Sequence, residues 1–413
     1  MNAGPESQAL GDQELVASFD LECLPPSFFA DPYPTYAALR RLSPVHRCKD
    51  GSVLLTRHAD LGAVYRDREH FSADKRAVFG PKFGVGTPLY EHHTSSLVFS
   101  DPPYHTRVRR QIVGALSPAA IKGMVPGLEA LVTSLCDAIE LRGRFDLIED
   151  YAAAIPIEVI GNLLGVPRDE RGSLRGWSLA ILGALDPGRS PADLEAGQRS
   201  VAEFLEFTRV LVAQRRRHLR GADDLLSRLI RDETGGEELT EHELLHNCIF
   251  LLNAGHETTT NLIGNGLHLL LGCEGERARL LAKPELLGSA IEECLRYESS
   301  NQLGNRLVVA PVAIGGHAFE AGTYLTLCIG AANRDPAAFV DPDRFNIGRD
   351  PNRHLAFAAG GHACAGMSVA RLEGQVAIAG FLRRFPRARL LAGAQRNPRA
   401  RFRGFAALPA TII

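Results

Sequence analysis

The chain has 413 residues, of which 45% are hydrophobic and 23% charged, and its formal net charge is -2. This composition is that of a folded protein with a large core. The near-neutral charge favours neither nucleic acid nor an anionic membrane surface as a partner.

The N-terminal segment lacks a basic stretch followed by an apolar one, so it does not read as a secretory signal. No run of about 18 apolar residues occurs, and we therefore expect no membrane-spanning helix. The 8 cysteines are scattered, without CxxC or zinc-finger spacing, which indicates neither a disulfide framework nor a structural zinc site. We expect a cytoplasmic protein.

The first expected elements are a helix over residues 33–41 and a β-hairpin that turns at Asp50-Gly51. From residue 101 to 279 apolar residues recur three and four positions apart, which is typical of helices. Within this region a loop starts with TGGEE at residue 234 and leads into one long helix over residues 240–272.

Thr240 and Glu243 form a capping box at the start of this long helix. The helix is apolar around much of its circumference, so it is expected to run through the core. After it come a helix over residues 284–297, short β segments, an irregular stretch over residues 333–353 and a last helix over residues 365–381. No domain boundary is visible, and we expect a single, mainly α domain over residues 1–413 with small β-sheets.

The segment FAAGGHACAG, residues 357–366, carries the strongest chemical signal. A cysteine just before a helix meets free amide N–H groups and the positive end of the helix dipole, which favours the thiolate. The glycines of this segment let the backbone lie close to a flat ring. A thiolate is a strong donor to haem iron and promotes cleavage of the O–O bond. The alternative is a structural cysteine in a Gly-rich loop.

Two further motifs lie on predicted helices. AGHETT, residues 254–259, places Gly255 in a helix interior, where glycine costs about 1 kcal/mol relative to alanine and therefore calls for a reason. Such a glycine can open a groove beside a hydroxyl and a carboxylate. The alternatives are a helix N-cap and a solvated acidic turn, and the apolar flanks disfavour the solvated turn. Glu293 and Arg296 are three residues apart and share a helix face, so they can form an ion pair.

These segments, together with DPPYHTRVRR at residues 101–110, resemble the signature of the soluble bacterial cytochromes P-450 in order and spacing. The closing GFAALP also resembles the final hairpin turn of that family, so the resemblance covers nearly the whole chain. Ala358 departs from the pattern, because the family more often has glycine there.

The resemblance implies the cytochrome P-450 fold, with the long central helix over a haem b and the cysteine loop beneath it. It implies that Cys364 is the iron ligand and that Glu257 and Thr258 are the acid–alcohol pair that delivers protons. A structural triad would join Glu293 and Arg296 to Arg344 or Arg349. Further cofactor-binding residues, including those that pair with the haem propionates, would be His105, Arg109, Ala254, Arg306, Phe357, Gly360, His362 and Gly366.

The implied activity is that of a monooxygenase, which inserts one atom of O2 into a small-to-medium, largely apolar organic substrate. No flavin or ferredoxin-like module is fused to the chain, so we expect electrons from a separate ferredoxin or flavodoxin with its NAD(P)H reductase. This partner would meet a monomer at a basic face formed by Arg107, Arg110, Arg353 and Arg371. The alternatives are a haem-thiolate enzyme that uses peroxide or performs oxidative coupling, and a non-catalytic haem-binding protein.

The expected substrate pocket mixes apolar and polar side chains, which suits a medium-sized organic molecule with some oxygen or nitrogen function. The segment over residues 77–93 is rich in glycine and proline and is expected to move as a loop that admits substrate. The sequence leaves the identity of the substrate open. The residues expected to line the pocket are Phe79, Phe83, Leu97, Phe250, Asn253, Asn301, Gln302, Leu303 and Phe405.

Overall fold

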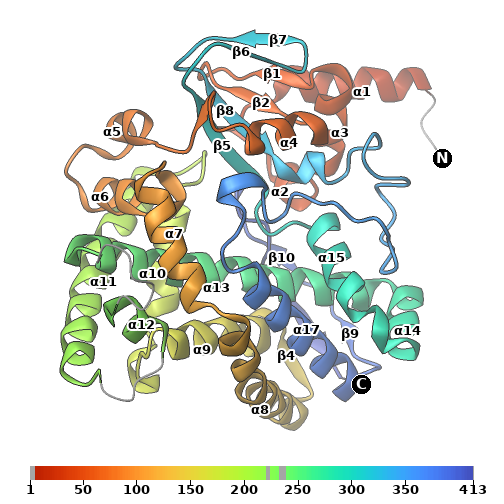
Figure 1. The fold of residues 1–413 in the computed structure, drawn as a ribbon. Helices are drawn as coiled ribbons and strands as arrows, with labels where there is room; N and C mark the ends of the chain where they lie inside the picture. The colour runs from red at the N-terminus through yellow and green to blue at the C-terminus, as the bar shows by residue number, and fades with distance from the viewer. Residues whose placement is uncertain (1–4, 220–223, 232–238, 413) are drawn as a thin grey trace.

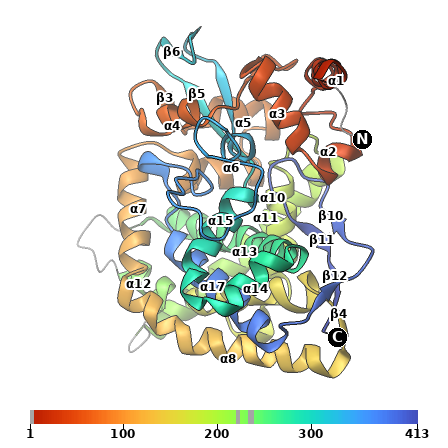
Figure 2. The same cartoon turned by 90° about the vertical axis from the view of Figure 1, so that its right-hand side faces the viewer.

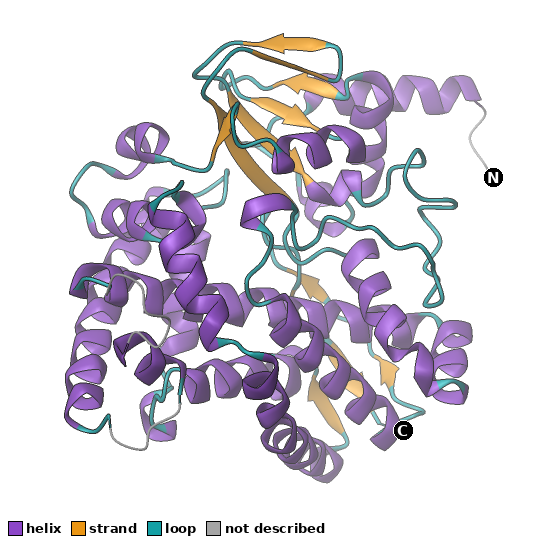
Figure 3. Ribbon diagram, viewed as in Figure 1, coloured by secondary structure: helices purple, strands orange, loops and turns teal. Residues whose placement is uncertain are grey.

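The computed structural model describes residues 5–219, 224–231 and 239–412. Helices form most of the body, and one larger sheet lies at the edge of the molecule that also carries α1 (Figures 1 and 3). The expectation of a mainly α fold with small sheets is confirmed. The loop expected to start at residue 234 lies outside the described residues.

The long helix α13 (Glu241–Gly272) crosses the middle of the molecule in Figure 1 and is seen end-on near the centre of Figure 2. Thr240 and Glu243 form the expected capping box, in which each side chain accepts a hydrogen bond from the backbone N–H of the other residue. Most of its side chains are buried, because it is apolar on more than one face. The helices that pack against it are α9 (Ala154–Leu163), α10 (Leu174–Gly183), α11 (Pro191–Arg217), α15 (Leu287–Tyr297) and α17 (Met367–Arg384).

The remaining helices surround this core. In the N-terminal third they are α1 (Pro5–Ser18), α2 (Pro26–Ala30), α3 (Tyr33–Leu42), α4 (His58–Arg66), α5 (Arg76–Phe83), α6 (Pro88–Ser95) and α7 (Tyr104–Ala115). Later in the chain they are α8 (Pro118–Arg142), α12 (Leu225–Arg231), α14 (Glu274–Ala282) and α16 (Ile329–Ala332). The helices expected near residues 33–41, 284–297 and 365–381 are present as α3, α15 and α17.

The main sheet has five strands in the order β1-β2-β8-β5-β3. The expected hairpin joins β1 (Val45–Arg47) to β2 (Val53–Leu55), and Gly51 in its turn has a positive φ of 82°. The other strands are β3 (Phe71–Ser72), β5 (Leu303–Val308) and β8 (Tyr324–Cys328). Smaller sheets are formed by β6 (Val312–Ile314) with β7 (His317–Phe319), by β4 (Arg144–Asp146), β12 (Pro409–Thr411) and β9 (Arg389–Leu390), and by β10 (Gln395–Arg396) with β11 (Phe405–Ala407).

Residues 77–93, expected as a loop, are mostly helical. Pro88 occupies the first turn of α6, and the Thr87 side chain caps that helix by accepting a hydrogen bond from the Tyr90 backbone N–H. The short connection between α5 and α6 holds Gly84 and Gly86, both with positive φ. Gly84, Gly86 and Pro88 therefore mark helix ends here, while Gly80 and Pro81 lie inside α5.

One helix, α8, passes the length and composition test for crossing a membrane, with a mean hydropathy of 1.3 over an 18-residue window. The sequence was not expected to contain such a helix. A single helix of this kind is weak evidence, because core helices of soluble proteins pass the same test. Only 17% of that window is buried, and the buried side chains Leu128, Val132, Cys136 and Ile139 belong to a core shared with α17.

Candidate active site

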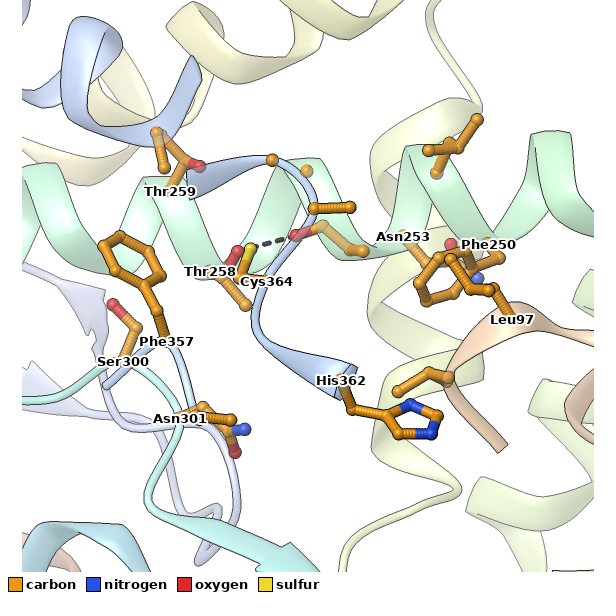
Figure 4. Close-up of a pocket in the computed structure, with 18 of the residues that line it drawn as sticks. Leu97, Phe250, Asn253, Thr258, Thr259, Ser300, Asn301, Phe357, His362 and Cys364 are labelled. Carbon is orange, nitrogen blue, oxygen red and sulfur yellow. Dashed lines mark hydrogen bonds between the residues drawn. The ribbon is translucent and has the colours of Figure 1, made fainter. Parts of the chain in front are cut away.

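The cysteine loop connects the irregular stretch before it to α17 and lies close to α13 (Figure 4). The Cys364 N–H donates a hydrogen bond of 2.9 Å to the Phe357 carbonyl, which closes the loop. A Cβ built at Gly360 would lie 2.2 Å from the Tyr65 carbonyl oxygen, so only glycine fits there. At Gly366, by contrast, a Cβ would meet nothing within 4 Å. The backbone therefore borders an open cavity beside the sulfur.

The departure from the family pattern, Ala358, falls on a strained position of this loop. Ala358 has a φ of 56°, in the left-handed region that favours glycine. The methyl group at this residue therefore costs conformational energy that a glycine would avoid.

Burial raises the pKa of the Cys364 thiol, while a hydrogen bond from the Gly366 backbone and the charges of Arg109 and Arg371 act in the opposite direction. A bound metal ion deprotonates a coordinating thiol outright. The loop thus supplies a buried sulfur that a metal ion could convert to the thiolate.

Four basic side chains meet at one edge of the same cavity, namely His105, Arg109, Arg306 and His362. The rings of His105 and His362 lie with centroids 3.9 Å apart, and His105 Nε2 is buried without a partner. Within the described part of the chain, neither arginine forms an ion pair with a carboxylate. Burial lowers the pKa of His105 to about 4 and that of His362 to about 2. The cluster therefore lacks anions that a ligand with two carboxylates would supply.

Glu293 and Arg296 of α15 form a bidentate ion pair, with two N–O distances of 2.8 Å. Arg349 completes the group, because its Nε lies 3.1 and 3.2 Å from the Glu293 oxygens. Arg344 does not take this place, since it contributes only its backbone carbonyl, which accepts hydrogen bonds from Arg296 and Arg349. Asn352, which the sequence did not indicate, donates to Glu293 at 3.1 Å.

Glu257 and Thr258 point in different directions from α13. Thr258 lines the cavity, and its Oγ1 donates a hydrogen bond of 2.6 Å to the Ala254 carbonyl (Figure 4). Glu257 does not line the cavity and instead accepts hydrogen bonds of 2.8 and 3.0 Å from Arg399. Burial raises the pKa of Glu257 to about 7, although Arg399 acts to lower it. This carboxyl can therefore gain or lose a proton near neutral pH.

Comparison with known proteins decides the family. A family model described as Cytochrome P450 matches residues 191–272 and 277–409. The biotin biosynthesis cytochrome P450 of Bacillus subtilis (strain 168) is 34% identical over 402 residues, covering 93% of this chain and 97% of the relative. The cytochrome P450 monooxygenase PikC of Streptomyces venezuelae is 38% identical over 378 residues, covering 89% of this chain and 87% of PikC.

The chain belongs to the cytochrome P450 family. It is similar over its length to the crystal structure of P450BioI in complex with hexadec-9Z-enoic acid ligated acyl carrier protein, with a TM-score of 0.88 and 32% identity. That alignment covers 94% of this chain and 100% of P450BioI. The activity is that of a haem-thiolate monooxygenase, and the substrates of this class are O2 and a small molecule.

The residues of this P450 fit a haem. Cys364 places a sulfur in the cavity, Gly366 leaves the adjacent backbone bare, and the four basic side chains offer partners for two propionates. Phe357 and Ala254 also line the cavity. Two residues that the sequence did not indicate, Tyr65 in the last turn of α4 and Arg68 just after that helix, belong to the same edge. The Tyr65 ring lies 5.2 Å below the Arg306 guanidinium, and the Arg68 guanidinium approaches Gly361.

The P450 cavity is lined by five of the nine expected pocket residues, which are Leu97, Phe250, Asn253, Asn301 and Leu303. The expectation was wrong for Phe79 and Phe83, whose rings pack against each other 5.0 Å apart in a core behind the cavity. It was also wrong for Gln302, which turns to donate to the Ser299 carbonyl at 2.7 Å, and for Phe405, which packs beneath Arg396. Further lining residues that the sequence reasoning did not single out include His92, His93, Ser300, Arg401 and Phe402.

The four arginines of the expected basic face differ in whether they form ion pairs or are exposed. Arg107 is bonded to Glu243, and Arg371 forms a bidentate pair with Glu292 at 2.7 and 2.8 Å. Arg110 and Arg353 are exposed. Any electrostatic attraction from this face would therefore come mainly from the latter two.

Proposed function

We propose that this P450 binds haem b through the Cys364 sulfur and hydroxylates or epoxidises a medium-sized, largely apolar organic molecule. The observation that carries the proposal is one shared cavity. Cys364, the four basic side chains and Thr258 all line it, and most of the other lining side chains are apolar. Figure 4 shows Cys364, Thr258 and His362 among the lining residues. When bound, haem would supply the activation of O2 and the insertion of one oxygen atom.

The chain's own residues would bind the substrate and supply protons. Thr258 offers a hydroxyl in the cavity, anchored on the Ala254 carbonyl. Glu257 is the adjacent acid, and its pKa of about 7 lets it hold a proton at neutral pH. In this proposal Glu257 takes a proton on the side of Arg399 and passes it toward the Thr258 hydroxyl. A rotation of the Glu257 side chain away from Arg399 would be required.

Electrons are proposed to come from a separate ferredoxin or flavodoxin that docks on a monomer over the exposed Arg110 and Arg353. The Arg110→Glu variant is expected to slow reduction by ferredoxin, with the difference shrinking as salt is raised. Reduction at the wild-type rate would reject this docking face. The eight free cysteines support action in the reducing cytoplasm.

The function is tested with the holoenzyme, a surrogate ferredoxin and its reductase, and ¹⁸O2. A compound that shifts the haem spin state is used as the substrate. The expected product carries one ¹⁸O atom, and its formation consumes a matching amount of NAD(P)H. A product that forms only with peroxide, or that contains no oxygen from O2, would instead identify one of the alternative haem-thiolate activities.

A further inference from the structure

Three polar side chains of the cavity wall are buried without hydrogen-bond partners. His92 and His93 lie on α6 and Asn253 lies on α13, and each is 2% exposed. All three line the cavity. Within the described residues, His92 Nδ1, His93 Nε2 and both amide atoms of Asn253 meet no hydrogen-bonding group. A buried polar group without a hydrogen-bond partner is costly, so these three residues destabilise the ligand-free fold.

The position of Asn253 relative to Cys364 follows from its place on α13. Asn253, Phe250 and Thr258 of α13 all line the cavity, and Asn253 and Thr258 are turned from each other by about 140° around the helix axis. Asn253 is five residues before Thr258, which separates them by about 7.5 Å along the axis. Figure 4 shows Asn253 beside Phe250 and Leu97, while Thr258 lies near Cys364. A group bound at Asn253 would therefore sit to one side of the sulfur and not over it.

The chemistry of the wall selects neutral ligands. Burial lowers the pKa of His93 to about 3 and that of His92 well below its usual value, so both rings are neutral at pH 7. A neutral imidazole offers one donor and one acceptor, and an amide offers both kinds. A hydroxyl can use both kinds of partner and a ketone can use the donors, while a carboxylate would bring a charge into a site without a cation on these three residues.

We infer that His92, His93 and Asn253 form a recognition wall for a neutral, hydroxyl- or ketone-bearing part of the substrate. This inference rests on the proposed function and deepens it by naming the substrate class. The wall would orient the substrate so that a carbon at a fixed distance from the oxygen function faces the reacting site.

A competing ligand class is suggested by Arg401, which lines the same cavity. Its Nη1 donates to the Leu303 carbonyl at 2.7 Å, while its Nε is buried without a partner. A carboxylic acid would bind there. The wall provides three unpartnered side chains and Arg401 provides one, so the neutral class is favoured, and the acid is the alternative outcome of the test.

The test measures binding to the purified holoenzyme by the spin-state shift of the haem spectrum. The probes are testosterone, which is neutral and carries a ketone and a hydroxyl, and myristic acid. The variants are Asn253→Leu and His93→Phe. Thr260→Val is the control, because the Thr260 hydroxyl is also buried and unpartnered on α13 but does not line the cavity.

Asn253→Leu and His93→Phe are each expected to weaken testosterone binding about tenfold, because each removes a hydrogen bond to the probe. Myristic acid binding should change less than about twofold in either variant, and Thr260→Val should leave both probes at wild-type affinity. The thermal midpoint of ligand-free Asn253→Leu should equal or exceed that of the wild type, since an unpaired amide is lost.

Unchanged testosterone affinity in both cavity variants would overturn the inference. So would a clear fall in the thermal midpoint of Asn253→Leu, which would give the amide a structural role. A third contradiction is a wild-type enzyme that binds myristic acid, loses that binding in Arg401→Gln and does not bind testosterone. These outcomes differ from a failure of the proposed function, which would appear as the absence of thiolate-ligated haem in the wild type.

Discussion

Two buried polar regions of the molecule differ in one respect. The first is the cluster of Glu293 with Arg296, Arg349 and Asn352, and the second is the wall formed by His92, His93 and Asn253. Glu293 receives hydrogen bonds from Arg296, Arg349 and Asn352. The wall residues line the cavity and, among the described residues, carry buried ring and amide atoms without a hydrogen-bond partner. Folding alone completes the first region, while the second needs a ligand to complete it. Substitutions should therefore cost stability in the first region and binding in the second.

The largest effect is expected at Glu293. The Glu293→Gln variant leaves two buried guanidinium groups without their counter-ion and should lose about 3–5 kcal/mol of unfolding free energy, together with haem retention. Arg349→Gln should act in the same direction. Arg344→Gln is the matched control, because its side chain is exposed, and it should stay within about 0.5 kcal/mol of the wild type. Urea unfolding measures all three, and equal losses at Arg344 and Arg349 would contradict the assignment of the triad.

Substitution of Glu257 should change the free energy of unfolding by an intermediate amount that depends on pH. Burial raises its pKa in the folded protein to about 7, from a usual value of 4.5, so the stability associated with the protonated form is lost as the pH rises through 7. Between pH 5 and 8 the wild type should lose about 3 kcal/mol relative to Glu257→Gln, which does not titrate. Parallel pH profiles of unfolding free energy for the two proteins would show that the carboxyl is ionised across this range.

The smallest effect is expected at Ala358. Ala358→Gly relieves a left-handed backbone and should raise stability by about 0.5–1 kcal/mol. Ala359→Gly is the control, since Ala359 has an extended φ of -150° and should lose a similar amount because glycine adds entropy to the unfolded chain. Thermal unfolding of the two holoenzymes gives the comparison. A loss at both positions would show that the loop does not strain Ala358.

The contrast between the regions also explains what the sequence could predict. The capping box at Thr240 and the pair of Glu293 and Arg296 depend on spacing within one helix, and such spacing is visible in sequence. Arg344 and Arg349 are five residues apart in an irregular stretch, so sequence left both open until the structure placed Arg349 on Glu293. Arg399 pairs with Glu257 from 142 residues away, a separation that no local pattern spans.

The residues that line the substrate cavity were the hardest part of the site to predict. Phe79, Phe83 and Phe405 were expected in the cavity because an apolar side chain looks the same in sequence whether it lines a cavity or fills a core. His92 and His93 were not singled out for the opposite reason. They sit in a helix that was expected as a loop, and their importance comes from a lack of partners, which only the packed structure reveals.

The ferrous–carbon monoxide difference spectrum of the purified protein, measured beside the Cys364→Ser variant, is the most direct test of Cys364 as the haem ligand. A Soret band strongly red-shifted from the position of His-ligated haem is expected in the wild type and should be lost in the variant. An unshifted band in the wild type, a red-shifted band that persists in the variant, or a wild-type protein that binds no haem would contradict the assignment.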